Sequence, residues 1–228
     1  MMKRSENGQP GVLPVFSTRT QTRAFYDKIS RVYDLLADRS EAPVRNRGLE
    51  TLAVGPGEAV LEVGCGTGGC LASIVEAVEP EGRVFGVDLS TGMLEQSGRL
   101  LGREKLADRA ELLCADAAAL PFADDRLDAV FMSFTLELFD TPEIPAVLAE
   151  CRRVLRPGGR LVVVGMSKEG DPDSMVRIYE WAHRHFPNFV DCRPIFVRRA
   201  IEEAGFQVRS AEITHMWVPV EIILAENP

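Results

Sequence analysis

Apolar and polar positions along this chain follow two periods, one typical of buried strands and one typical of helices. Short apolar runs predict strands at 59–64, 83–88, 110–115, 127–133 and 160–165. Helical spacing falls between most of them, at 69–78, 91–102 and from Thr141-Pro142 to about Leu155, with 156–159 as a stop signal. Such alternation is typical of a parallel sheet buried on both faces. We therefore expect a doubly wound α/β fold.

Both ends of the chain depart from this rhythm. Residues 1–19 show no helical period and are expected to form a flexible arm, whereas 20–56 predict a helical cap whose second helix begins near Pro43. After a helix at 195–204, two strands are expected at 206–214 and 217–225. The gap between them is too short for a crossover, so they must pair antiparallel as a hairpin. Seven strands result, and residues 20–228 are expected to form one domain.

An additional segment, residues 167–193, stands between the fifth strand and the last helix. Its apolar residues fall on two helical faces, which a helix with one buried face would not require. Two interpretations stay open: an inserted helix that packs on the core, or a wall on the substrate side of a pocket.

Composition narrows the function classes. The chain has 228 residues and a net charge of −8, which disfavours nucleic acid as a partner. Five cysteines without a C-x-x-C pair indicate reduced thiols and no metal site, as is usual in the cytoplasm. No apolar run reaches the roughly 20 residues that a membrane-spanning helix needs, and the first 21 residues lack the apolar centre of a signal peptide. We expect a cytoplasmic protein.

The most specific motif is the glycine-rich turn that follows the first strand, within 60–69. Glycines at 64, 66, 68 and 69 allow positive φ and let a ligand approach bare backbone. The motif therefore predicts a nucleotide-like cofactor. Because Gly64, Gly66 and Gly69 also satisfy the G-x-G-x-x-G pattern of dinucleotide sites, a nicotinamide-dependent oxidoreductase is the alternative.

Two further acidic residues end the next strands of the predicted sheet. Asp88 lies 20 residues beyond Gly68, where a carboxylate can accept both hydroxyl protons of a ribose. Asp116 ends the third strand, where it can accept a hydrogen bond from the amino group of adenine. Ribose and base would then be recognised by consecutive strands.

These motifs together resemble those of the class I S-adenosylmethionine-dependent methyltransferases. The resemblance rests on Glu62-Val63-Gly64-Cys65-Gly66-Thr67-Gly68, Asp88, Asp116 with Leu120-Pro121-Phe122, Asp128-Ala129-Val130 and Leu155-Arg156-Pro157-Gly158-Gly159, in that order. It implies S-adenosylmethionine as cofactor, S-adenosylhomocysteine as product, and a Rossmann-like sheet. The cofactor residues that it implies are Tyr26, Tyr33, Glu62, Gly64, Cys65, Gly66, Thr67, Gly68, Asp88, Leu89, Met93, Asp116, Ala117, Ser133 and Phe134.

The methyl acceptor is less well marked. Residues 25–34 are similar to the start of ubiquinone/menaquinone-biosynthesis methyltransferases and of bacterial phospholipid N-methyltransferases. This resemblance implies a small-molecule or lipid-like acceptor, either a quinone precursor or a phospholipid head group. Peripheral membrane contact stays open. The reaction requires no covalent catalyst, and the weak candidates for a catalytic group are Tyr33, Glu137 and His185. A non-catalytic cofactor-binding protein is a further alternative, and monomer or homodimer stays open.

Overall fold

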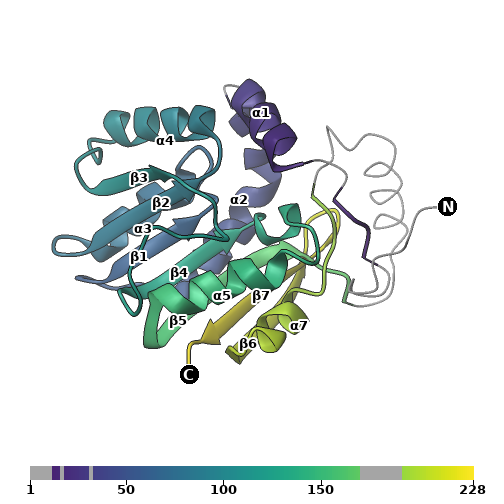
Figure 1. The fold of residues 1–228 in the computed structure, drawn as a ribbon. Helices are drawn as coiled ribbons and strands as arrows, with labels where there is room; N and C mark the ends of the chain where they lie inside the picture. Colours follow the sequence, from purple (N-terminus) through teal and green to yellow (C-terminus); the bar gives the residue numbers. More distant parts are fainter. Residues whose placement is uncertain (1–11, 16–17, 31–32, 170–191) are drawn as a thin grey trace.

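One seven-stranded sheet forms the centre of the molecule in the computed structural model (Figure 1), which describes residues 12–15, 18–30, 33–169 and 192–228, with only the backbone of 33–40. The strands are β1 (Ala59–Val63), β2 (Arg83–Asp88), β3 (Ala110–Cys114), β4 (Leu127–Ser133), β5 (Leu155–Met166), β6 (Gln207–His215) and β7 (Pro219–Glu226). Their order in the sheet is β3-β2-β1-β4-β5-β7-β6. β3, β2, β1, β4 and β5 pair in parallel, and β7 pairs antiparallel with β5 and β6. The predicted fold class is confirmed, including the antiparallel hairpin.

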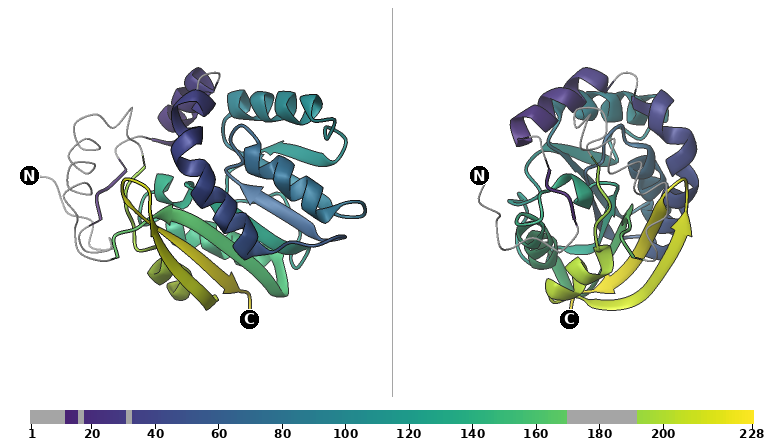
Figure 2. Two further views of the ribbon diagram at one scale, coloured as in Figure 1. Left: turned by 180° about the vertical axis from the view of Figure 1, so that it is seen from behind. Right: turned by 90° about the vertical axis from the view of Figure 1, so that its right-hand side faces the viewer.

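Helices cover both faces of the sheet, as its apolar strands require. α2 (Tyr33–Leu52), α3 (Gly69–Val78) and α4 (Thr91–Arg103) cover one face, and α5 (Ile144–Val154) and α7 (Val197–Glu203) cover the other (Figure 2). Each face has its own buried apolar cluster, one around Phe131 and Val162 and one around Val130 and Val163. Successive residues of β4 and β5 thus pack into opposite clusters. Because both clusters are apolar, successive buried positions of such a strand are apolar in the sequence.

The strand order reverses between β1 and β4, which are neighbours in the sheet but not in the sequence. From β1 the chain proceeds to β2 and β3 on one side, and β4 and β5 lie on the other. In open parallel sheets, ligands bind in the crevice outside the carboxyl ends of the strands at such a switch point. The fold therefore locates the site before any side chain is considered.

The N-terminal helices differ from the sequence prediction in their bounds. α1 spans Arg19–Ile29 and ends at the cap Ser30, and α2 begins at Tyr33 and continues through Pro43 to Leu52. The prediction of a helix start near Pro43 was wrong: Pro43 lies inside α2, where it removes one backbone donor without ending the helix. α1 begins inside the segment predicted as an arm, because Thr18 and Gln21 form a capping box.

The predicted stop at 156–159 also differs from the structure. α5 ends at Val154, and β5 runs through this segment from Leu155. The pairing with β4 shifts register here, from Leu127 opposite Leu155 to Ala129 opposite Arg160, and Gly158 has a φ of +74°. The glycines thus form a bulge within the strand instead of a separate turn.

Two other expectations fall partly or wholly outside the described residues. Most of the expected arm, 1–11 and 16–17, lies outside them, and so does 170–191, the greater part of the expected insertion. Over the parts that are described, no helix combines the length and the apolar character needed to cross a bilayer.

Candidate active site

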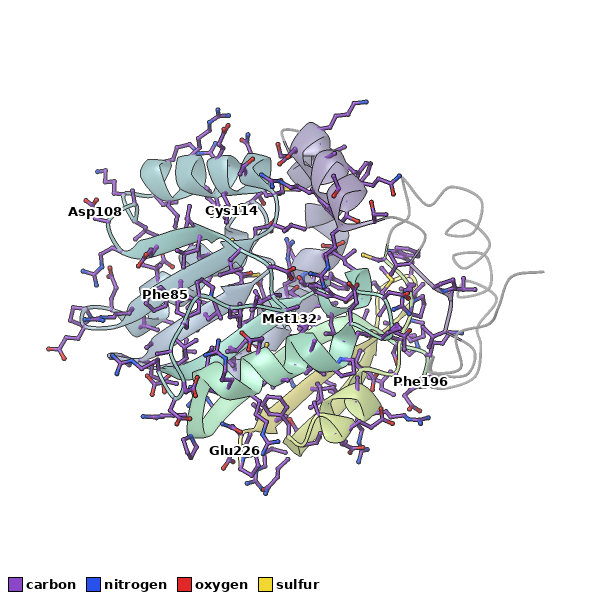
Figure 3. All side chains as sticks on the ribbon, viewed as in Figure 1. Phe85, Asp108, Cys114, Met132, Phe196 and Glu226 are labelled. Atoms are coloured by element: carbon purple, nitrogen blue, oxygen red, sulfur yellow. The ribbon has the colours of Figure 1, made fainter. Side chains whose placement is uncertain are left out.

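A cavity of about 900 Å³ opens at the carboxyl ends of β1, β2 and β4. In Figure 3, Cys114 marks the carboxyl end of β3, beside α4 and α1. Asp108, just before the start of β3, marks the opposite edge of the sheet, where the parallel strands begin. The cavity brings together thirteen of the fifteen residues expected at the cofactor: Tyr26, Glu62, Gly64, Cys65, Gly66, Thr67, Asp88, Leu89, Met93, Asp116, Ala117, Ser133 and Phe134. Of the other two, Gly68 does not line the cavity, and the side chain of Tyr33 lies outside the described residues.

The glycine turn between β1 and α3 is held by the neighbouring strand. The backbone N–H groups of Gly64 and Cys65 both donate to the Val87 carbonyl, at 2.7 and 3.1 Å. Gly64 and Gly66 have φ values of +71° and +52°, which side chains with a Cβ adopt only with strain. A Cβ on Gly64 would overlap Thr135, whereas one on Gly66 would meet nothing within 4 Å. Gly66 is therefore the point where the turn presents bare backbone to open space.

Gly68 has a structural role instead. It is the N-cap residue of α3, with a φ of +91°, and a Cβ at this position would overlap Ser97 of α4. Gly69, which begins α3, lines the cavity. The third glycine that the family resemblance indicates thus lets two helices approach each other, and the next residue faces the cavity.

Asp88 joins the glycine turn to the start of α4. Its Oδ2 accepts a hydrogen bond from the Gly66 N–H at 2.9 Å, and its Oδ1 accepts one from the Ser90 N–H at 2.8 Å. Burial raises the pKa of this carboxyl, and the two backbone donors oppose the shift. Because each oxygen accepts a backbone hydrogen bond, the carboxylate has one orientation at the carboxyl end of β2.

Within the part of the chain that the structure describes, two buried polar atoms at the cavity lack a hydrogen-bond partner. They are Oε2 of Glu62, whose residue is 3% exposed, and Oγ of Ser133. Burial raises the pKa of Glu62 well above its usual range, and the positive charge of Arg45 opposes this. Unpartnered buried polar groups are costly unless a ligand supplies the missing hydrogen bonds. These residues therefore fit a ligand that carries both donors and acceptors, as the amino-acid part of S-adenosylmethionine does.

Asp116 is already engaged within the chain. Its Oδ1 accepts from the Ala118 N–H at 2.9 Å, and its Oδ2 accepts from the Arg19 guanidinium, which also contacts Glu143. Sequence reasoning did not identify Arg19 or Glu143 as cavity residues. The Thr18-x-x-Gln21 capping box was the signal that could have shown that a helix begins at Arg19.

The remaining catalytic candidates lie apart from the cavity or outside the described residues. Glu137 is fully buried and does not line the cavity; its Oε1 accepts from the Met166 N–H at 3.1 Å. Burial raises its pKa to about 7. His185 lies outside the described residues. The wall after β4 consists instead of Phe134, Thr135, Leu138, Phe139 and Asp140.

Comparisons with known proteins agree with this geometry. The family described as "Methyltransferase domain" matches residues 60–159. A demethylmenaquinone methyltransferase of Symbiobacterium thermophilum is 34% identical over 150 residues, which are 64% of this chain and 59% of that protein. One of Staphylococcus aureus is 30% identical over 217 residues, covering 83% of this chain and 86% of that protein.

Among solved structures, a SAM-dependent methyltransferase from Aquifex aeolicus aligns with a TM-score of 0.62 at 21% identity, covering 81% of this chain and 89% of that one. This likeness supports the fold, and the match to the Staphylococcus aureus protein supports the family. The chain belongs to the class I S-adenosylmethionine-dependent methyltransferases.

Proposed function

We propose that this chain transfers the methyl group of S-adenosylmethionine to a ring carbon of a neutral, quinol-type aromatic acceptor. The observation that carries the choice of acceptor is the likeness to a demethylmenaquinone methyltransferase over 83% of the chain. The cavity supports it: about 900 Å³ lies near the upper end of the range for small-molecule sites, which leaves room for a cofactor and an acceptor together.

The charge of the cavity favours an acceptor without a phosphate. Its described lining contains eight carboxylates and three arginines. Each arginine lies beside an acidic residue: Arg19 beside Asp116 and Glu143, Arg23 beside Asp27, and Arg45 beside Glu41. A phosphate would need a cationic partner to replace its hydration. Between the two acceptor classes that the sequence indicates, this favours the quinone precursor over the phospholipid head group.

The cofactor assignments follow the geometry of the cavity. We assign the ribose hydroxyls to Asp88, the amino group of adenine to Asp116, and the ammonium of the methionyl part to Glu62. Each of these carboxylates lines the cavity at or beside the end of a strand. Leu89 and Met93 supply apolar surface beside the base.

In this reaction the cofactor supplies a methyl group on a sulfonium, so the chain contributes chiefly alignment and the exclusion of water. Held by Glu62, Asp88 and Asp116, the cofactor would supply the methyl group and leave as S-adenosylhomocysteine, and the methylated ring carbon would release its proton to solvent. Phe134 and Thr135 lie where β4 ends, with a φ of +49° at Phe134, and they turn the wall after β4 toward the cavity. We assign them to the place where the acceptor meets the cofactor, so that Phe134 keeps the cofactor contact expected from the sequence.

The test pairs a binding measurement with a transfer measurement. S-Adenosylhomocysteine is expected to raise the melting temperature and NADH is not; the reverse would overturn the methyltransferase assignment in favour of an oxidoreductase. With labelled S-adenosylmethionine, label is expected to enter a reduced prenyl naphthoquinol. Label in vesicles of phosphatidylethanolamine, with none in the naphthoquinol, would overturn the acceptor class while leaving the methyl donor intact.

A further inference from the structure

α1 lies across the cavity without any buried residue of its own. Arg19, Thr22, Arg23 and Tyr26 form one stripe at helical spacing and line the cavity. The apolar residues Phe25, Tyr26 and Ile29 of α1 are only partly buried, so polar contacts at the two ends help to hold the helix in place.

The C-terminal end of α1 is fixed closely to α4. Oδ1 of Asp27 accepts hydrogen bonds from the Ser90 hydroxyl at 2.6 Å and from the Gly92 N–H at 2.9 Å. A Cβ on Gly92 would lie 2.9 Å from the Asp27 Cα, so the two backbones are in direct contact. This end is an anchor, set by backbone contact and by donors at the N-terminus of a helix.

The N-terminal end is held by charge at the surface. The Arg19 guanidinium donates to Oδ2 of Asp116 and lies 2.9 Å from Oε1 of Glu143, to which its Nε also donates at 3.0 Å. The three side chains are between 31% and 40% exposed. Exposed ion pairs contribute only about 0–1 kcal/mol each and weaken with salt. At this end the helix itself is thus held by exposed ion pairs, while the segment before it is attached separately, through the hydrogen bond from the Val15 N–H to Oδ1 of Asp140 at 3.3 Å.

One of these ion pairs uses the carboxylate that we assign to adenine. We propose that Arg19 is a positioning residue of the cofactor site: it holds the start of α1 over the cavity in the free protein, and it yields Asp116 to the adenine amino group while keeping Glu143. This inference rests on the proposed function, since it takes Asp116 as the adenine partner. It makes cofactor entry and release depend on one exchange of hydrogen bonds, with Asp27 as the hinge.

The exchange of labelled S-adenosylhomocysteine against an excess of unlabelled compound tests this directly. Arg19→Gln is expected to release label about twofold to fivefold faster than the wild type at low salt, because the exposed ion pair with Glu143, which holds α1 over the bound cofactor, is lost. Association is expected to accelerate as well, since Asp116 is then free, so the equilibrium affinity changes less than either rate. Arg19→Lys is expected to restore part of the wild-type rate.

Arg47→Gln is the matched control. It removes the same charge from a guanidinium that also lies between two exposed carboxylates, Glu50 at 3.2 Å and Glu212 at 3.3 Å, and Arg47 does not line the cavity. Its exchange rate is expected to stay within about twofold of the wild type. Raising the salt from about 10 to about 300 mM is expected to accelerate exchange in the wild type and to leave Arg19→Gln unchanged.

Equal exchange rates for Arg19→Gln and Arg47→Gln would overturn the inference while cofactor binding itself persists. So would the same salt dependence of exchange in the wild type and in Arg19→Gln. A wild type that binds no label would overturn the proposed function and this inference with it. A purely structural role of Arg19 would lower affinity without accelerating association.

Discussion

Substituting alanine separately at Gly64 and Gly66 separates what the glycine turn does for folding from what it does for binding. Both residues have positive φ, and an L-residue in that region costs about 1–2 kcal/mol. This strain is common to the two variants. They differ in what a Cβ would meet: at Gly64 it would overlap Thr135, whose Cβ would be 3.0 Å away, and at Gly66 it would meet nothing.

The expected losses of unfolding free energy follow from these two contributions. Gly66→Ala is expected to lose about 1–2 kcal/mol, from backbone strain alone. Gly64→Ala is expected to lose a further 1–3 kcal/mol or so, because the added methyl group overpacks the space beside Thr135. For ligand affinity we expect the opposite order: Gly66→Ala should weaken binding more than its small loss of stability suggests. The methyl group on Gly66 enters the open cavity, where a loss of about 1.4 kcal/mol or more corresponds to at least tenfold weaker S-adenosylhomocysteine binding.

Urea denaturation measures the first effect and isothermal titration with S-adenosylhomocysteine the second, both under conditions where each variant is folded. If Gly66→Ala bound the ligand as tightly as the wild type, the cofactor would not approach the backbone at this turn. If the two variants were equally stable, the steric argument for Thr135 would be refuted.

Two other predictions concern buried carboxyl groups. Asp88→Asn replaces an acceptor with a donor facing the backbone N–H of Gly66 or Ser90, so S-adenosylhomocysteine should bind about 10- to 100-fold more weakly by titration; unchanged affinity would contradict the ribose assignment. Burial raises the folded-state pKa of Glu137 to about 7 from an ordinary 4.5, so the folded state holds the extra proton between these values and stability falls as pH rises through that window. Urea denaturation at about pH 5 and pH 8 should show a loss of about 3 kcal/mol in the wild type and no such loss in Glu137→Gln. Equal pH dependence of stability in the wild type and the variant would disprove this prediction.

The central strands of the sheet could be predicted from the sequence because they are buried on both faces. Apolar runs such as Val162 and its neighbours mark the buried part of each strand, although not the start of β5, and the short gap before β7 requires the hairpin. The cavity floor followed for a related reason. Asp88 and Asp116 come where parallel strands end, and parallel strands bring their carboxyl ends to one edge of the sheet.

The cover of the cavity could not be predicted in this way. Arg19 reaches Asp116 across 97 positions of sequence, and the Asp27 anchor joins α1 to α4 across more than 60. No periodic pattern encodes such pairs, since each joins elements that are distant in the sequence through a single polar side chain. Pro43 misled for a different reason: a proline favours the first turn of a helix, but α2 tolerates it inside.

The floor and the cover of the cavity are therefore held by interactions of different strength, and this difference suits an enzyme that must exchange its cofactor in each turnover. The glycine turn and Asp88 are tied by backbone hydrogen bonds at the tips of buried strands, which keeps the recognition groups in register. The start of α1, in contrast, is held over the cavity by exposed ion pairs of Arg19, which on our proposal exchange when the cofactor binds. A buried, apolar contact at Arg19 would hold the cofactor longer but would slow release of the product, and release limits the turnover of many enzymes.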